Sequence, residues 1–229
     1  MAGAIESGYD SPLVGREVEL KTLEGGLTAS HPGLSLLVGG PGTGKGRLLR
    51  ELRARASPYP CRLVPADPAG DLEAPWLVVD RQSTVDDFRR ATAPPPEEEV
   101  KADYTMSRDF DLILVYGYRP AKDFHEWFTG EFLRGLAEAT PPRVVVVAGS
   151  AGDVAGLEQL SDRQVKLGPL PREAVVAELR ALDAALADPL QEPELEIYAD
   201  AIVSDPALLG SLRQVLPLTT SAQGADRQD

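Results

Sequence analysis

Residues 33–49 read GLSLLVGGPGTGKGRLL, and this stretch decides the fold. The apolar run from Leu34 to Val38 is bounded by glycines, which is typical of a buried strand. The leucines that follow residue 46 recur at helical spacing and predict a helix with one apolar face. Between this strand and this helix, residues 39–45 match the pattern G-x-x-x-x-G-K of a phosphate-binding loop.

The residue types of this loop suit an anion. Glycines adopt the backbone conformations that let successive N–H groups turn inward around a phosphate, the following helix adds its positive N-terminal end, and Lys45 can reach the terminal phosphates. Where the pattern continues with a Ser or Thr that ligates Mg²⁺, this chain has Gly46. We therefore predict phosphate binding with weakened metal positioning, by Gly39, Gly40, Pro41, Gly42, Thr43, Gly44, Lys45, Gly46 and Arg47.

Strands and helices alternate along the rest of residues 1–167. Strands are predicted at CRLVPA from Cys61, at WLVVD from Trp76, at residues 109–118 and at residues 143–149. The last two are apolar without alternation, as in the central strands of a parallel sheet. An aromatic stripe from Phe124 to Leu136 predicts one crossover helix between them. This order predicts an α/β fold, a P-loop NTPase with a central, mainly parallel sheet flanked by helices.

The pattern changes after about Leu167, where three short helices follow without strands. The third would begin with Asp205 as its N-cap and Pro206 in its first turn. These helices predict a small C-terminal helical lid. We therefore divide the chain into a nucleotide-binding α/β domain at 1–167, a helical lid subdomain at 168–217 and a flexible polar tail at 218–229.

Charge and composition exclude several functions. The chain has 36 acidic and 23 basic side chains, a net charge of −13, which argues against nucleic acid and against an anionic membrane surface as partners. The 8 bases and 6 acids of residues 1–62 make this the only basic part of the chain, and it holds the phosphate loop. The absence of a signal peptide pattern and of an apolar span, and a single cysteine, predict a cytoplasmic protein.

The segment PLVGRE at residues 12–17, the helix after it and the phosphate loop together resemble the opening of the STAND and Orc1/Cdc6-like branch of the AAA+ ATPases. LILVYGYRP, a helix that contains tryptophan, and VVVVAGS are similar to the Walker B strand, the next helix and the sensor 1 strand of that family. VSDPALLGSL is similar to its lid segment. The resemblance implies ATP or ADP as the ligand, with the adenine base contacted by Val14, Gly15, Arg16 and Pro206.

The Walker B region departs from the family pattern. Tyr116 stands where the strand ends in an aspartate that orders the water shell of Mg²⁺, and Arg119 stands where a nearby acid activates the attacking water. A neutral phenol and a permanent cation can do neither. With Gly46, three positions that serve Mg²⁺ and water activation are altered together. We therefore assign no catalytic residue and no metal ligand, regard Mg²⁺ as a doubtful cofactor, and expect little hydrolysis.

Three carboxylates could restore the missing acid. Asp80 closes an apolar strand as a Walker B acid does, and Asp109 and Asp111 precede the apolar run that ends at residue 118. We predict that all three are solvated, because carboxylates are mostly exposed. His125 is predicted to be a residue of a helix face, and Cys61 a packing residue, since no histidine lies near it in sequence.

Three functions stay open on this reading of the sequence. The first is a STAND-like regulatory module that binds ATP or ADP with weak or no hydrolysis and acts through a protein partner, either a separate effector or a second copy. The second is an active, Mg²⁺-dependent ATPase switch. The third is a scaffold that has lost nucleotide binding. Lys45 and the intact glycines favour binding, and the altered set Gly46, Tyr116 and Arg119 disfavours turnover.

Overall fold

The computed structural model describes residues 15–28, 32–65, 76–93, 109–183, 191–204 and 208. Val14, Pro206 and the predicted tail at 218–229 lie outside these residues. The described chain forms two compact units. An α/β unit contains the described residues of Val18–Gly40 and Gly44–Leu167, and a second unit contains those of Met1–Glu17, Pro41–Thr43 and Gly168–Asp229.

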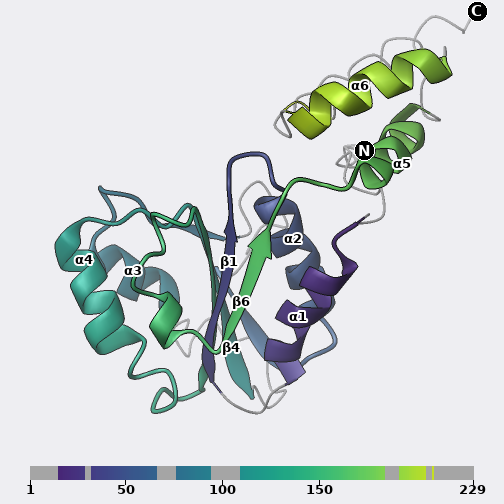
Figure 1. The fold of residues 1–229 in the computed structure, drawn as a ribbon. Helices are drawn as coiled ribbons and strands as arrows, with labels where there is room; N and C mark the ends of the chain where they lie inside the picture. Colours follow the sequence, from purple (N-terminus) through teal and green to yellow (C-terminus); the bar gives the residue numbers. More distant parts are fainter. Residues whose placement is uncertain are drawn as a thin grey trace, which may run out of the picture. The chain divides into compact units, whose positions relative to one another are not determined.

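A parallel sheet forms the centre of the α/β unit (Figure 1). Its six strands in the described residues are β1 Gly33–Gly39, β2 Cys61–Val64, β3 Leu77–Val78, β4 Phe110–Tyr116, β5 Arg143–Gly149 and β6 Arg163–Leu167. The strand order is β2-β4-β5-β1-β6, and β3 pairs with the last two residues of β4. All pairs are parallel, so the chain leaves β1, β4 and β5 at the same edge of the sheet. Ligands of open α/β sheets bind at this edge.

Helices cover both faces of the sheet. The helices α1 Glu17–Thr28 and α2 Lys45–Ala56 lie on one face, and α3 Val85–Thr92 and α4 Lys122–Trp127 lie on the other (Figure 1). Each of α1 and α2 has a stripe of buried leucines, namely Leu20, Leu23 and Leu27 in α1 and Leu48, Leu49 and Leu52 in α2. Burial of each such side chain contributes about 1.5–3 kcal/mol, so these stripes hold α2, and with it the phosphate loop, against the sheet.

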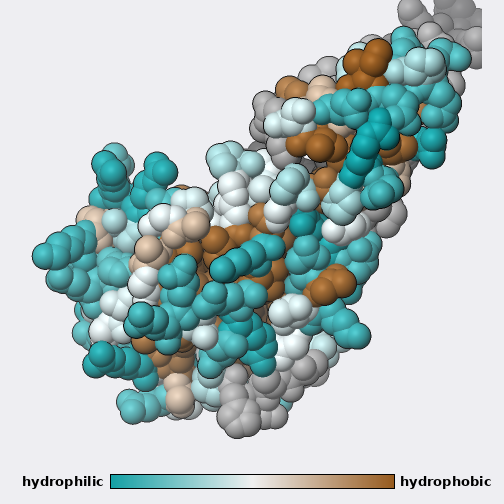
Figure 2. Space-filling model, viewed as in Figure 1, coloured by the Kyte–Doolittle hydropathy of each residue, from teal (hydrophilic) through white to brown (hydrophobic). Residues whose placement is uncertain are grey.

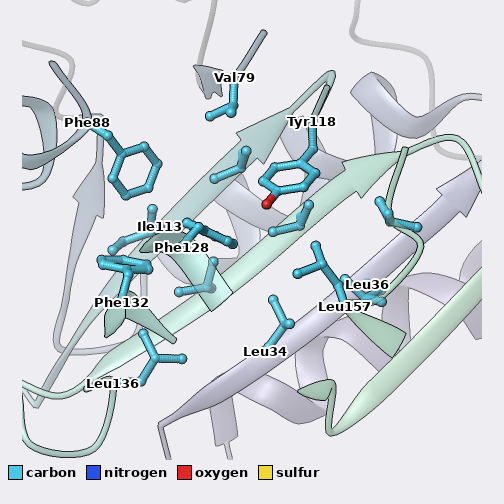
Figure 3. Packing of buried hydrophobic residues seen from close by; sticks show 14 of the residues in the cluster. Leu34, Leu36, Val79, Phe88, Ile113, Tyr118, Phe128, Phe132, Leu136 and Leu157 are labelled. Carbon is cyan, nitrogen blue, oxygen red and sulfur yellow. The ribbon is translucent and has the colours of Figure 1, made fainter. Parts of the chain in front are cut away.

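The core under α3 and α4 combines a group of aromatic rings with aliphatic side chains of the sheet (Figure 3). Phe88 of α3 makes edge-to-face contacts with three phenylalanines of the crossover segment, at centroid distances of 5.6, 5.7 and 5.1 Å for Phe124, Phe128 and Phe132. The buried Tyr118 has its hydroxyl 3.0 Å from Nδ1 of His125. His125 is therefore a hydrogen-bonding residue of α4 at the edge of this core.

The crossover segment is not the single α-helix predicted from its aromatic stripe. Helix α4 ends at Trp127, and a π-helix, Phe128–Phe132, follows it. The Leu133 N–H donates to the Phe128 carbonyl at 2.9 Å, five residues back. The wider turn keeps both Phe128 and Phe132 buried, so the packing of the rings decided the helix type.

Two elements were missed in the sequence. Strand β6 alternates polar and apolar residues, and only Val165 and Leu167 are buried. Helix α3 is short, and its start is set by Thr84, whose side chain accepts a hydrogen bond from the Asp87 N–H at 3.1 Å. Conversely, the strand predicted over WLVVD is paired only at Leu77–Val78.

The second unit contains two packed helices, α5 Arg172–Asp183 and α6 Glu192–Ser204. Their contact buries aliphatic side chains of both, namely Val175, Val176, Leu179, Leu195, Ala199 and Ile202. Exposed ion pairs flank it, from Arg172 to Glu196 and Asp200. Figure 2 shows apolar residues on the surface of this unit as well, and Ile197 and Tyr198 of α6 are exposed. The third predicted helix falls on residues that are not described, apart from Leu208.

The prediction that Asp111 is solvated was wrong. Asp111 lies at the start of β4 with 2 % of its surface exposed, and its carboxylate accepts two hydrogen bonds from Arg62, at 2.9 and 2.6 Å. The same guanidinium donates to the carbonyl oxygens of Thr92 and Ala93 at the end of α3. This bidentate pair joins β2, β4 and the end of α3, at the sheet edge opposite the phosphate loop.

The thiol of Cys61 is expected to react slowly in the folded protein. Burial, with the nearby carboxylate of Asp111 as a second cause, raises its pKa to about 11. At pH 8 the thiolate fraction of native Cys61 should then be about a hundredfold lower than that of an ordinary cysteine. Alkylation by iodoacetamide, followed by mass spectrometry, should be slower in native protein than in urea by about this factor. Equal rates would contradict the assignment of Cys61 as a packing residue.

Candidate functional site

The phosphate loop runs from the end of β1 at Gly39 to the start of α2 at Lys45. Two of its glycines have a left-handed backbone, Gly42 with φ 72° and Gly44 with φ 90°. Residues with a Cβ rarely adopt these angles, so the glycines of the motif are needed here. Gly44 is the N-cap of α2 and has no side chain to bond the first N–H groups, and the first turn carries no acid. These features leave the positive end of a twelve-residue helix suited to an anion.

Lys45 folds back over its own loop. Its Nζ donates to the carbonyl oxygens of Gly39 at 2.7 Å and of Gly40 at 2.6 Å. Burial lowers the pKa of Lys45, and the carboxylate of Asp153 partly offsets this. A phosphate placed in the loop would meet a cation that is already partly desolvated, and charge-assisted hydrogen bonds are strong in such a place.

Gly46 is covered by an aromatic ring. A Cβ added at Gly46 would lie 3.2 Å from Cη2 of Trp76, which is closer than ordinary van der Waals contact. The indole also contacts Tyr116, with ring centroids 4.9 Å apart and planes tilted by 31°. Arg50, one turn along α2, has its guanidinium carbon 5.0 Å from the centre of the same indole. Two positions altered relative to the family pattern, 46 and 116, thus share one neighbour, Trp76.

Arg119 forms an ion pair with the carboxylate of Asp153. Its Nε donates to Asp153 at 3.1 Å, and its backbone N–H donates to Val79 at 2.8 Å. Ser150, at the end of β5, donates its hydroxyl proton to the other oxygen of Asp153. These hydrogen bonds, from Ser150 first and then from Arg119, lower the pKa of Asp153. Asp153 is therefore a carboxylate whose two oxygens are each bonded to a neighbour.

Sequence reasoning missed both Trp76 and Asp153. Trp76 lies 30 residues from Gly46 in the chain, and no local pattern joins them. Asp153 follows Ser150 by three residues, and this spacing is typical of a turn closed by a serine hydroxyl, so it offered a local signal.

The other candidate carboxylates do not form a metal site. Asp80 lies at the same edge as Tyr116, but its carboxylate accepts from the N–H groups of Gln82 at 2.8 Å and Ser83 at 3.1 Å and closes an exposed turn. These backbone hydrogen bonds lower its pKa. Asp109 and Asp111 lie at the opposite end of β4. No cluster of three His, Cys, Asp or Glu side chains that could hold a metal ion occurs among the described residues.

The residues present therefore do not fit Mg²⁺ at this loop. Magnesium requires oxygen ligands in octahedral geometry, which P-loop proteins supply from the Ser or Thr after the lysine and from the Walker B acid. Here the first position has no side chain, and an indole covers it. The second position is a phenol whose ring packs on that indole.

The predicted adenine residues that are described, Gly15 and Arg16, lie in the second unit. Gly15 has φ 72°, and a Cβ there would lie 2.6 Å from Cβ of Ala174. Arg16 is 5 % exposed, and its guanidinium donates to the Gly168 carbonyl. Both residues thus pack against the segment that leads into α5. Val14 and Pro206 lie outside the described residues, so the adenine contacts stay a prediction.

The strand order and the glycine loop after β1 define the α/β unit as a P-loop NTPase fold. Solved structures share it. A RuvB mutant from Thermotoga maritima matches with a TM-score of 0.59 at 14% identity, over 95% of this chain and 67% of its own. Domain III of the replication initiation protein DnaA from Thermotoga maritima matches with a TM-score of 0.51 at 14% identity, over 93% and 88%. This chain shares the fold of both structures.

No protein-family model matches the chain, and no curated protein does. Among the described residues, every helix is too short or too polar to cross a membrane.

Proposed function

We propose that this chain is a STAND-like regulatory module that binds ATP or ADP through the loop Gly39 to Arg47, hydrolyses it weakly or not at all, and acts through a protein partner. One observation carries the proposal. The phosphate loop has left-handed glycines, its lysine and the helix N-terminus, while the two positions that would hold a metal are a glycine covered by an indole and a tyrosine whose ring packs on that indole.

The AAA+ fold supports nucleotide binding, since proteins of this class generally bind ATP or ADP. Val14, Gly15, Arg16 and Pro206 are the residues we propose for the adenine base. The acid excess of the whole chain supports a protein rather than a nucleic acid as the further partner. A cytoplasmic location stays a prediction from the sequence.

The two alternative functions, an active ATPase and a scaffold without nucleotide, require different arrangements of side chains. An active ATPase needs a metal-ligating carboxylate at the edge where β4 ends, and the carboxylates described there, Asp80 and Asp153, are hydrogen-bonded to neighbours. A scaffold without nucleotide would keep Lys45 on the Gly39 and Gly40 carbonyl oxygens permanently.

Thermal unfolding of the full chain with ATP, ADP and GTP, each with and without Mg²⁺, tests the proposal together with a phosphate-release assay. Binding at a hundredfold excess over the dissociation constant stabilises the folded protein by about 2.7 kcal/mol. We expect stabilisation by ATP or ADP without phosphate release. Mg²⁺-dependent release would favour the ATPase, and no stabilisation by any nucleotide would favour the scaffold.

A further inference from the structure

We propose that the Trp76 indole takes the place of the metal at this site, so that the loop binds the free nucleotide anion and excludes its Mg²⁺ complex. The inference rests on the proposed nucleotide binding and goes beyond it, because it assigns the choice between metal-free and metal-bound nucleotide to one residue.

Sterics carry the first step. In a metal-dependent P-loop protein the side chains at the positions of Gly46 and Tyr116 both reach the ion or its water shell. The Trp76 indole contacts both positions here, 3.2 Å from a Cβ at Gly46 and 4.9 Å between ring centroids at Tyr116. A ring in contact with both positions occupies space that the ion and its waters would need. It also explains why position 46 has no side chain.

Charge carries the second step. The guanidinium carbon of Arg50 lies 5.0 Å from the centre of the indole ring, and Nζ of Lys45 lies at the carbonyl oxygens of Gly39 and Gly40 in the same loop. With the α2 N-terminus, these two cations attract phosphate and repel a divalent cation. Nearby, the carboxylate of Asp153 is bonded to Arg119 and Ser150. In other P-loop proteins Mg²⁺ neutralises part of the phosphate charge. Here Arg50, Lys45 and the α2 N-terminus would neutralise it.

Calorimetric titration of the full chain with ADP, in EDTA and in excess Mg²⁺, tests the inference. We expect the dissociation constant for total ADP to be higher in excess Mg²⁺ than in EDTA, because Mg²⁺ converts free ADP into the complex that the loop excludes. ADP binding that is as tight or tighter in Mg²⁺ would overturn the inference and leave the proposed nucleotide function standing. Binding in neither condition, with ATP as with ADP, would overturn both.

A variant series isolates Trp76. Tyr116→Asp introduces an acid but keeps the indole, and we expect its ADP binding to stay weaker in Mg²⁺ than in EDTA, as in the unaltered chain. Tyr116→Asp with Trp76→Ala opens the space, and binding should become about tenfold tighter in Mg²⁺ than in EDTA. Tyr116→Asp with Trp76→Phe keeps a ring and should behave like Tyr116→Asp alone. If Tyr116→Asp alone gains the full Mg²⁺ dependence, or if the Trp76→Ala pair gains none, Trp76 does not exclude the metal.

Tryptophan fluorescence gives a second measurement. If Trp76 had only a structural role, its emission would not change when ADP binds. The chain has two tryptophans, so Trp127→Phe leaves Trp76 as the single reporter. Its emission should change on ADP addition in EDTA and follow the calorimetric binding curve. Unchanged emission while calorimetry shows binding would place the nucleotide away from Trp76 and overturn the inference.

Discussion

Replacement of Asp111 by asparagine should lower the free energy of unfolding by about 3–5 kcal/mol. Asp111 is 2 % exposed, and its ion-pair partner, the Arg62 side chain, is 10 % exposed. Asparagine leaves the guanidinium charged in a place with little water, and an uncompensated buried charge is costly. Because Arg62 also bonds the carbonyl oxygens at the end of α3, the loss should extend to that helix. Urea denaturation followed by circular dichroism measures the effect.

Asp109→Asn is the matched control. It makes the same chemical change two residues away, at an exposed position, and should lower stability by much less than Asp111→Asn. The double variant Arg62→Met with Asp111→Leu removes both charges and should recover most of the loss. If Asp111→Asn were as stable as Asp109→Asn, the Arg62–Asp111 pair would not be the buried connection between β2 and β4 described above.

Lys45→Ala should remove most of the stabilisation that ATP or ADP gives to the protein. The positive charge of Lys45 lies within the phosphate loop, because its Nζ donates to the carbonyl oxygens of Gly39 and Gly40. Loss of this charge-assisted contact should weaken binding at least tenfold. At a nucleotide concentration of one hundred times the original dissociation constant, the gain in stability would then fall from about 2.7 to about 1.4 kcal/mol or less. Thermal unfolding with and without nucleotide measures both values.

Lys122→Ala controls for the loss of a lysine. Lys122 is 88 % exposed on α4 and is paired only weakly with Glu126 at 3.6 Å. This variant should keep the full nucleotide effect. A Lys45→Ala protein that is stabilised as strongly as Lys122→Ala would show that the phosphates do not bind at this loop, and the proposed function would need another site.

The contacts among positions 46, 76 and 116 bear on whether a single substitution could create a metal site. A serine or threonine at Gly46 would press its Cβ against the Trp76 indole, and an aspartate at Tyr116 would remove the ring that packs on it. The three residues therefore support one another sterically. A metal-ligating side chain placed at only one of positions 46 and 116 should not create a metal site, because the Trp76 indole would still contact the other position.

The main elements of the α/β unit could be predicted because each has a local cause. The run from Leu34 to Val38 is apolar apart from Ser35, which predicts a strand in the centre of a covered sheet, and the buried β1 confirms this. Elements held by long-range contacts escaped prediction. Strand β6 is half polar and is defined by its pairing with β1, and the π-helix follows from rings that pack on Phe88.

By itself the sequence determined the glycine-rich loop after β1 and the P-loop NTPase fold, and it showed that positions 46 and 116 are a glycine and a tyrosine, because glycine conformation, strand hydrophobicity and side-chain chemistry are properties of single residues or short runs. The tertiary structure alone decided which side chain covers Gly46 and which carboxylates are buried. Trp76 meets Gly46 across 30 residues, and Arg62 meets Asp111 across 49, through the pairing of strands and the packing of α2. Contacts of this kind depend on three-dimensional distance, which no local pattern encodes.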